Sequence, residues 1–262
     1  MCHYPDPDTN HPEPGGATDA GTGTGTITAA VRALMPSHPV CAEALALAKA
    51  TLPPSILYHS FRVFLYAQGF LRIFDDDAAN AANADHPSTE HDSDHHRDAY
   101  TFRAPPHVLF VACILHDVGT APQHDAVPER FEVVGADVAA RLLRAHDVPD
   151  PAVRDVWLAM ALHTSPGIAE RLGGTVRAVR LAVRADFGSY PPPPPVSIPG
   201  GAEMMSTIRW KLPRLEIEKD LGDAVVRQAL LDRIKAPAAS WPGDLLRAKM
   251  ADPGWEGVNQ GF

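Results

Sequence analysis

The sequence predicts an all-α protein whose helices form a single bundle. In most segments apolar residues recur every three to four positions, which is the spacing of one helix face. Strict alternation of apolar and polar residues, the pattern of half-buried strands, is rare, and proline or glycine separates the periodic segments. A chain of 262 residues is long enough to bury a substantial core, and we expect one helical domain over 26–250.

The two ends of the chain lack this periodicity. Residues 1–25 are rich in Pro, Gly, Thr and Asp, a composition that cannot bury enough apolar surface to fold, and we expect a disordered tail there. Residues 251–262 are expected to form an irregular tail. Short helices are expected at 26–35 and 39–50, with Ser37 placed to cap the second.

A long helix is expected next, over 56–74. It follows Pro53 and Pro54 and is apolar on most sides, which indicates a helix buried in the core. His59 and Arg62 lie on one face of this helix. We therefore expect His59 to be buried, and Arg62 to need a partner or a path to solvent.

An acidic, histidine-rich stretch, 75–100, interrupts the helical pattern. A tract of this kind can bind metal loosely, but nothing in it fixes the geometry of the ligands, and we expect a solvated insertion loop. A second loop is expected at 190–200, where the prolines at 191–195 cannot form a helix.

The remaining helices alternate with turns. Pro105 and Pro106 suit the first turn of a helix that ends near Val118, although the apolar run 108–115 would also fit a buried strand. Further helices are expected from 128 onward and at 149–164, 175–187, 202–211, 215–234 and 241–250. Three arginines on one side of 175–187 are expected to face solvent or another subunit: Arg177, Arg180 and Arg184.

The composition argues against several classes of partner. A net charge of -9 is unfavourable for binding nucleic acid or an anionic membrane surface. No apolar run approaches the ~20 residues of a membrane span, and the start of the chain lacks an apolar signal core. Three cysteines without paired spacing indicate neither a disulfide framework nor a thiolate zinc site, so we expect a cytoplasmic protein.

A titratable pair, His116-Asp117, closes the apolar run 108–115. Burying an imidazole beside a carboxylate is costly unless something binds both, and a divalent metal binds both. His59 lies on an earlier buried segment, and Asp186 on the buried stripe of a later one. Each residue alone fits a capped or hydrogen-bonded core residue, but the four together predict a metal site.

Three segments resemble the HD-domain superfamily of metal-dependent hydrolases: LYHSFRVFLYAQ with His59, CILHDVGT with His116 and Asp117, and LAVRADFGSY with Asp186. Within that superfamily the chain is most similar to the cyanamide hydratases, which share the proline-led opening, the HD-x-GT doublet and the FE start of the following helix. The resemblance implies an HD-domain bundle with one buried metal site that hydrates cyanamide to urea by metal-activated water. It implies one divalent metal, zinc first, with iron or manganese as alternatives.

Two positions narrow the expected chemistry. Many HD phosphohydrolases have a lysine where this chain has Thr120, and a neutral hydroxyl suits a small uncharged substrate better than a phosphate. Dinuclear members have a histidine ligand where Phe131 stands, and an aromatic ring cannot hold a second ion. Both differences favour a mononuclear site that acts on a small neutral molecule.

The expected metal ligands are His59, His116, Asp117 and Asp186. Asp117 is also placed to accept a proton from the attacking water, because the two would be adjacent. By resemblance, His163 and Thr120 would orient the substrate through hydrogen bonds. Glu132 is a further catalytic candidate, although a carboxylate at a helix start is favoured by the helix dipole alone.

Other functions fit the same residues. The chain would also suit a hydratase of another nitrile or isonitrile, a nucleotide phosphohydrolase or an iron-dependent oxygenase of the HD type. A regulatory or assembly module that keeps the metal for structure is the alternative outside enzymes. A small neutral molecule is the expected partner, and the sequence leaves the oligomeric state open, a homo-oligomer included.

Overall fold

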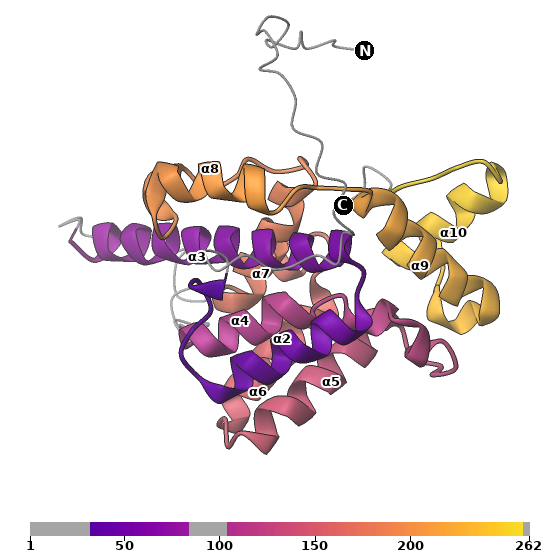
Figure 1. Cartoon of the computed structure of the whole chain (residues 1–262), viewed down its shortest axis with the longest axis horizontal. Coiled ribbons are helices and arrows are strands. Elements are labelled where there is room, and N and C mark those ends of the chain that lie inside the picture. Colours follow the sequence, from indigo (N-terminus) through magenta and orange to yellow (C-terminus); the bar gives the residue numbers. More distant parts are fainter. Residues whose placement is uncertain (1–31, 84–103, 259–262) are drawn as a thin grey trace, which may run out of the picture.

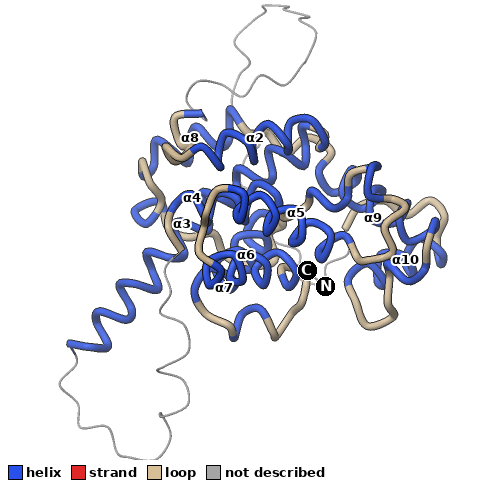
Figure 2. The backbone as a smooth tube through the Cα atoms, turned by 90° about the horizontal axis from the view of Figure 1, so that it is seen from below, coloured by secondary structure: helices blue, strands red, loops and turns tan. Residues whose placement is uncertain are grey.

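The structure, a computed structural model, describes residues 32–83 and 104–258 and is a bundle of helices (Figure 1). Its α-helices are α2 (Pro39–Thr51), α3 (Pro54–Asn83), α4 (Pro106–Leu115), α5 (Phe131–Ala145), α6 (Asp150–Leu162), α7 (Gly174–Asp186), α8 (Gly201–Lys211), α9 (Ile217–Leu231) and α10 (Trp241–Ala251). The short 3-10 turns are η1 (Val118–Thr120), η2 (Pro122–His124), η3 (Ala169–Arg171), η4 (Pro195–Ser197) and η5 (Arg233–Lys235). The described ranges contain no β-strand (Figure 2), so the all-α prediction is confirmed.

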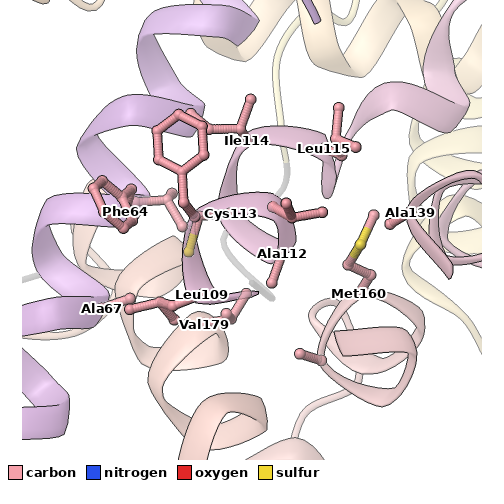
Figure 3. Close-up of a cluster of buried hydrophobic side chains, with 14 of the residues drawn as sticks. Phe64, Ala67, Leu109, Ala112, Cys113, Ile114, Leu115, Ala139, Met160 and Val179 are labelled. Carbon is pink, nitrogen blue, oxygen red and sulfur yellow. The ribbon is translucent and has the colours of Figure 1, made fainter. Parts of the chain in front are cut away.

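Helix α4 lies inside the bundle and forms much of its core. Every residue from Val108 to Leu115 is buried, and α2, α3 and α6 pack around the helix. Figure 3 shows Phe64 of α3 and Met160 of α6 on opposite sides of α4. A helix that is apolar all round is stable only when it is surrounded in this way. The strand alternative for 108–115 is therefore wrong.

Helix α3 packs along α7 and runs for 30 residues, to Asn83. The loop expected from residue 75 is wrong for 75–83, where the helix continues because the alanines of this stretch are strong helix formers. The remainder of the expected insertion, 84–100, lies outside the described residues, as do the tail 1–25 and most of the helix expected at 26–35. Neither α3 nor any other described helix combines the length and apolar character needed to cross a bilayer.

The N-terminus of α2 is capped by His38, whereas the sequence suggested Ser37. Nδ1 of His38 accepts a hydrogen bond from the main-chain N–H of Val40 at 3.2 Å. Pro39 occupies the first turn of the helix, where the missing N–H of proline costs no hydrogen bond. An imidazole nitrogen thus takes the capping place usually held by a hydroxyl or carboxylate.

Helices α9 and α10 lie side by side at one end of the bundle (Figure 1). Two side chains of α9 reach the loop that follows α4. Nε2 of Gln228 donates to the carbonyl of Gly119 at 2.9 Å, and Nη2 of Arg227 donates to the carbonyl of Thr120 at 2.8 Å. Helix α9 therefore holds η1 in place.

The turn η1 also packs against the start of α5. A Cβ atom added at Gly119 would lie 2.0 Å from the main-chain oxygen of Phe131. A distance that short is far inside van der Waals contact, so only glycine permits this approach of the two backbones.

The proline run is irregular over 191–194, begins the 3-10 turn η4 at Pro195, and packs on α3. Pro193 is buried, and a Cβ atom added at Gly69 of α3 would lie 2.8 Å from Cγ of that proline. The absence of a side chain at Gly69 therefore lets the loop lie against the helix.

Candidate metal centre

Three buried side chains converge at one point inside the bundle. His59 lies in α3, while His116 and Asp117 form the turn between α4 and η1. The two Nε2 atoms are 3.2 Å apart, and Oδ2 of Asp117 lies 3.1 Å from Nε2 of His116 and 3.8 Å from Nε2 of His59. The exposed fractions of His59, His116 and Asp117 are 0%, 0% and 1%. The structure thus brings together three of the four predicted ligands.

The hydrogen bonds on the far sides of the rings decide which nitrogen atoms carry protons. Nδ1 of His116 lies 2.7 Å from the carbonyl of Cys113, and Nδ1 of His59 lies 2.6 Å from Oδ2 of Asp186. A carbonyl or carboxylate oxygen only accepts, so both Nδ1 atoms are the donors. In the neutral rings the two Nε2 lone pairs then point at each other.

Oδ2 of Asp117 completes this group of acceptors. It is buried and has no hydrogen-bond partner among the described residues. A buried polar atom without a partner costs about 1–3 kcal/mol, and more when it is charged. Ligand atoms of His59, His116 and Asp117 all lie within 4.8 Å of one another. Two imidazole nitrogens and a carboxylate oxygen are ligands that divalent transition metals prefer, so this donor set fits such an ion.

The pKa shifts of these three residues also favour a bound cation. Burial lowers the pKa of His59 and favours the neutral ring that a metal requires. Burial alone would raise the pKa of Asp117, but the adjacent rings of His116 and His163 hold it well below its usual value. Burial also lowers the pKa of His116, yet the Asp117 carboxylate outweighs it and the net shift is upward. A proton on His116 would balance one carboxylate, whereas a divalent cation satisfies all three lone pairs at once.

Asp186, the fourth predicted ligand, lies on the other side of the His59 ring. Its carboxylate contacts Nδ1 of His59 and accepts two hydrogen bonds from Arg62, from Nε at 2.6 Å and from Nη2 at 2.8 Å. These donors hold the pKa of Asp186 well below its usual value, although burial alone would raise it. In this position Asp186 orients the His59 ring. Asp186 is therefore the partner that Arg62 was expected to need. The sequence indicated that need, because Arg62 is a cation on an otherwise apolar helix.

His163, at the end of α6, faces the group from another side. Its Nε2 lies 3.5 Å from Oδ1 of Asp117, and its ring centroid lies 5.0 Å from that of His116. Nδ1 of His163 lies 2.6 Å from the carbonyl of Met160 and is the donor of that hydrogen bond. Nε2, the other ring nitrogen, is therefore the one that faces Asp117.

Arg180 fixes the main chain at His163, a role that sequence reasoning missed. The expectation that Arg180 faces solvent or another subunit is wrong: it is 1% exposed within this chain, and its Nη1 donates to the carbonyl of His163 at 2.9 Å. Its charge is balanced by Glu170, which lies 2.9 Å from Nε. Of its neighbours on α7, Arg177 stacks on the ring of Phe74 at 4.4 Å.

The remaining candidates, Thr120 and Glu132, are both buried. The hydroxyl of Thr120 donates to the carbonyl of Asp117 at 2.7 Å, which ties it into the turn. Oε1 of Glu132 accepts from Nη2 of Arg130 at 2.5 Å and from the hydroxyl of Thr164 at 2.7 Å. The helix dipole is therefore not the main reason for a carboxylate at this position.

Phe131 is buried beside His163 and Trp241. Its ring centroid is 5.7 Å from that of His163 and 6.1 Å from that of Trp241. The ring offers no ligand atom next to the site.

Comparison with protein families matches the HD domain to residues 56–195, more than half of the chain. The chain belongs to the HD-domain family. All four predicted ligands lie within the matched range, and HD-domain proteins are generally metal-dependent hydrolases. A search of curated proteins finds no match to this chain. The matched HD domain ends before α8, so α9, the helix that holds η1 in place, and its neighbour α10 lie outside the matched range.

Proposed function

We propose that this HD-domain protein is a metal-dependent hydratase that adds water to the nitrile carbon of a small uncharged molecule, with cyanamide as substrate and urea as product. The observation that carries the proposal is the meeting of three buried acceptor atoms, on His59, His116 and Asp117. Two further contacts support this group: His163 faces Asp117, and Asp186 contacts His59. Such an arrangement would bind one cation and places His163 beside Asp117 for proton transfer.

A zinc ion held by His59, His116 and Asp117 would act as a Lewis acid and lower the pKa of coordinated water to about 7. Asp186 would keep Nε2 of His59 directed at the metal by holding Nδ1–H. This is the common arrangement in which a carboxylate behind a metal-bound histidine sets its tautomer and orientation.

Asp117 is placed to move a proton. Its Oδ2 faces the two histidines, while its Oδ1 lies 3.5 Å from Nε2 of His163. In the hydration of cyanamide the oxygen of water bonds to the nitrile carbon, and one proton passes to the nitrile nitrogen. Asp117 can take this proton from water, and His163 can hand it to the substrate. The isourea that forms then tautomerises to urea.

The residues around the site support an uncharged substrate. Thr120 places a hydroxyl where many HD phosphohydrolases place a lysine, and its hydrogen is donated to Asp117 within the turn. Phe131 contributes an apolar ring beside His163. A phosphate substrate would lack the lysine cation that usually binds it at the position of Thr120.

The test is a urea assay with cyanamide on purified protein of known metal content. We expect urea from the wild type and none from His116→Ala, provided that this variant stays folded. His124→Ala is a matched control, because the side chain of His124 lies outside the group while its main-chain oxygen keeps its bond to Lys235.

The same preparations decide among the alternatives. Phosphate release from a nucleotide panel would identify a phosphohydrolase, and oxygen consumption with bound iron would identify an oxygenase. Turnover of other nitriles or of isonitriles without turnover of cyanamide would change the substrate and keep the chemistry. A metal-loaded protein inactive in all these assays would identify a structural metal.

A further inference from the structure

The metal group itself is closed to solvent, so a substrate needs an entrance. Two hollows lie near it. The first, which we call the Thr164 hollow, has a volume of about 250 Å³ and is lined by Arg130, Thr164, Ser165, Ile168, Trp241 and Asp244. The second, which we call the Arg214 hollow, has a volume of about 650 Å³ and is lined by Arg62, Tyr66, Asp186, Ser206, Trp210 and Arg214.

Two residues that line the Thr164 hollow, Thr164 and Trp241, connect it to His163, which faces Asp117. Thr164 directly follows His163, whose Nε2 faces Asp117 at 3.5 Å. On the other side, the ring of Trp241 lies 6.1 Å from that of Phe131, which in turn lies 5.7 Å from the ring of His163. Trp241 and Phe131 thus form a row of rings from the hollow to His163, on the side of the site where His163 faces Asp117.

The Arg214 hollow reaches the site from behind. It ends on Asp186, whose carboxylate already accepts from Arg62 and contacts Nδ1 of His59. The hollow therefore reaches the Nδ1 side of the His59 ring, whereas Nε2, the atom that would bind the metal, lies on the opposite side. A substrate in the Arg214 hollow would therefore be separated from the metal-binding atoms by the His59 ring.

The polar groups of the Thr164 hollow indicate what it takes. The hydroxyl hydrogen of Thr164 is donated to Oε1 of Glu132, so its lone pairs are left to accept a hydrogen bond. The charges around the hollow are paired: Arg130 with Glu132, and Asp244 with Arg247. A site with an acceptor and balanced charges favours an uncharged molecule that donates an N–H group.

We propose that the Thr164 hollow is where the substrate of the metal centre enters and rests, and that Thr164 selects a small uncharged molecule with an N–H group. This inference rests on the proposed function, because it assumes that the metal centre is catalytic. From Thr164 the molecule would then move past Phe131 to reach Asp117 and His163.

The test compares two serine-to-tryptophan variants, one in each hollow. Ser165→Trp fills the Thr164 hollow and should lower kcat/KM for cyanamide at least about ten-fold with unchanged metal content and melting temperature. Ser206→Trp fills the Arg214 hollow and should leave kcat/KM within about two-fold of wild type. The opposite pattern, or equal effects of the two variants, would overturn the proposed entrance.

Thr164 is tested separately. Thr164→Val keeps the shape of the side chain but removes the hydroxyl, which is both the acceptor for the substrate and the donor to Glu132, and should raise KM about ten-fold, with a smaller change in kcat. Thr164→Ser keeps the hydroxyl and should restore KM. A rise in KM that the serine variant fails to restore would show that Thr164 does not hold the substrate.

A readout without turnover separates this inference from the proposed function. Cyanide, a small linear ligand, is added to cobalt-substituted protein, and the rate of change of the visible spectrum is measured. Slower access in Ser165→Trp but not in Ser206→Trp supports the entrance, even if wild type forms no urea and the hydratase proposal fails. Urea formation with equal cyanide access in both variants would keep the hydratase and reject the entrance.

Discussion

Oδ2 of Asp186 lies 2.6 Å from Nδ1 of His59, the ring nitrogen that points away from His116. The last aspartate of the HD-domain pattern therefore acts through a histidine in this structure. Arg62, one helical turn after His59, donates two hydrogen bonds to the same carboxylate. The three residues form a buried unit behind the candidate metal centre.

Replacing Asp186 by alanine should destabilise the protein and weaken metal binding. The variant leaves Arg62 buried without its carboxylate, which costs about 3–5 kcal/mol of unfolding free energy. It also frees Nδ1 of His59, and loss of such a partner lowers metal affinity roughly 10- to 100-fold. Denaturant unfolding and metal titration measure the two effects.

The double variant Arg62→Met with Asp186→Leu separates these effects. It removes both buried charges, so stability should return towards that of wild type, because apolar residues of similar volume can replace a buried ion pair. Metal affinity should stay low, because nothing then orients His59. If metal binding recovered together with stability, Asp186 would have no role in orienting that ring.

The purified protein should contain close to one divalent metal ion per chain. Removing this ion with a chelator should lower the melting temperature, since binding to the folded state adds to its stability. His116→Ala should contain almost none and should show no further drop with chelator. Two ions per chain, measured by elemental analysis, would contradict the argument from Phe131.

The stability of the metal-free protein should fall in acid. The pKa values of Asp117 and Asp186 are lower in the folded protein than in the unfolded chain, where a carboxyl titrates near pH 4. Their contribution is therefore complete above about pH 4 and is lost as the pH falls through the lower folded values. Urea midpoints of wild type and Asp186→Asn should differ most at neutral pH and converge below about pH 4. A difference independent of pH would show that the carboxylate charge is not what matters.

Gly119→Ala should be strongly destabilising, whereas Gly135→Ala should be tolerated. A Cβ at Gly119 would lie 2.0 Å from the Phe131 carbonyl, so the backbone beside the metal group has to move. We expect a loss of about 3 kcal/mol or more and reduced metal content. At Gly135, inside α5, the nearest atom would be 3.4 Å away, and alanine in a helix gains about 0.5–1 kcal/mol over glycine. Equal effects on the urea midpoint would contradict the close approach at Gly119.

Most helices follow from local patterns in the sequence. The apolar stripes predicted the start of α5 and both ends of α6 and α7 within a few residues, because a helix face is set by spacing along the chain. Helix ends were less predictable. The acidic stretch after Phe74 continues α3, and His38 rather than Ser37 caps α2, since several residue types can satisfy the same end of a helix.

The sequence by itself determined the helical class, the buried position of His59 and the pairing of His116 with Asp117, because these depend on periodicity and on adjacent residues. Only the tertiary structure decided which nitrogen of His59 faces His116, that Arg62 and Asp186 meet, and that Arg180 is buried at the carbonyl of His163. Those contacts join residues far apart in the chain. Their geometry is set by the packing of α3, α6 and α7 around α4, which no spacing along the sequence encodes.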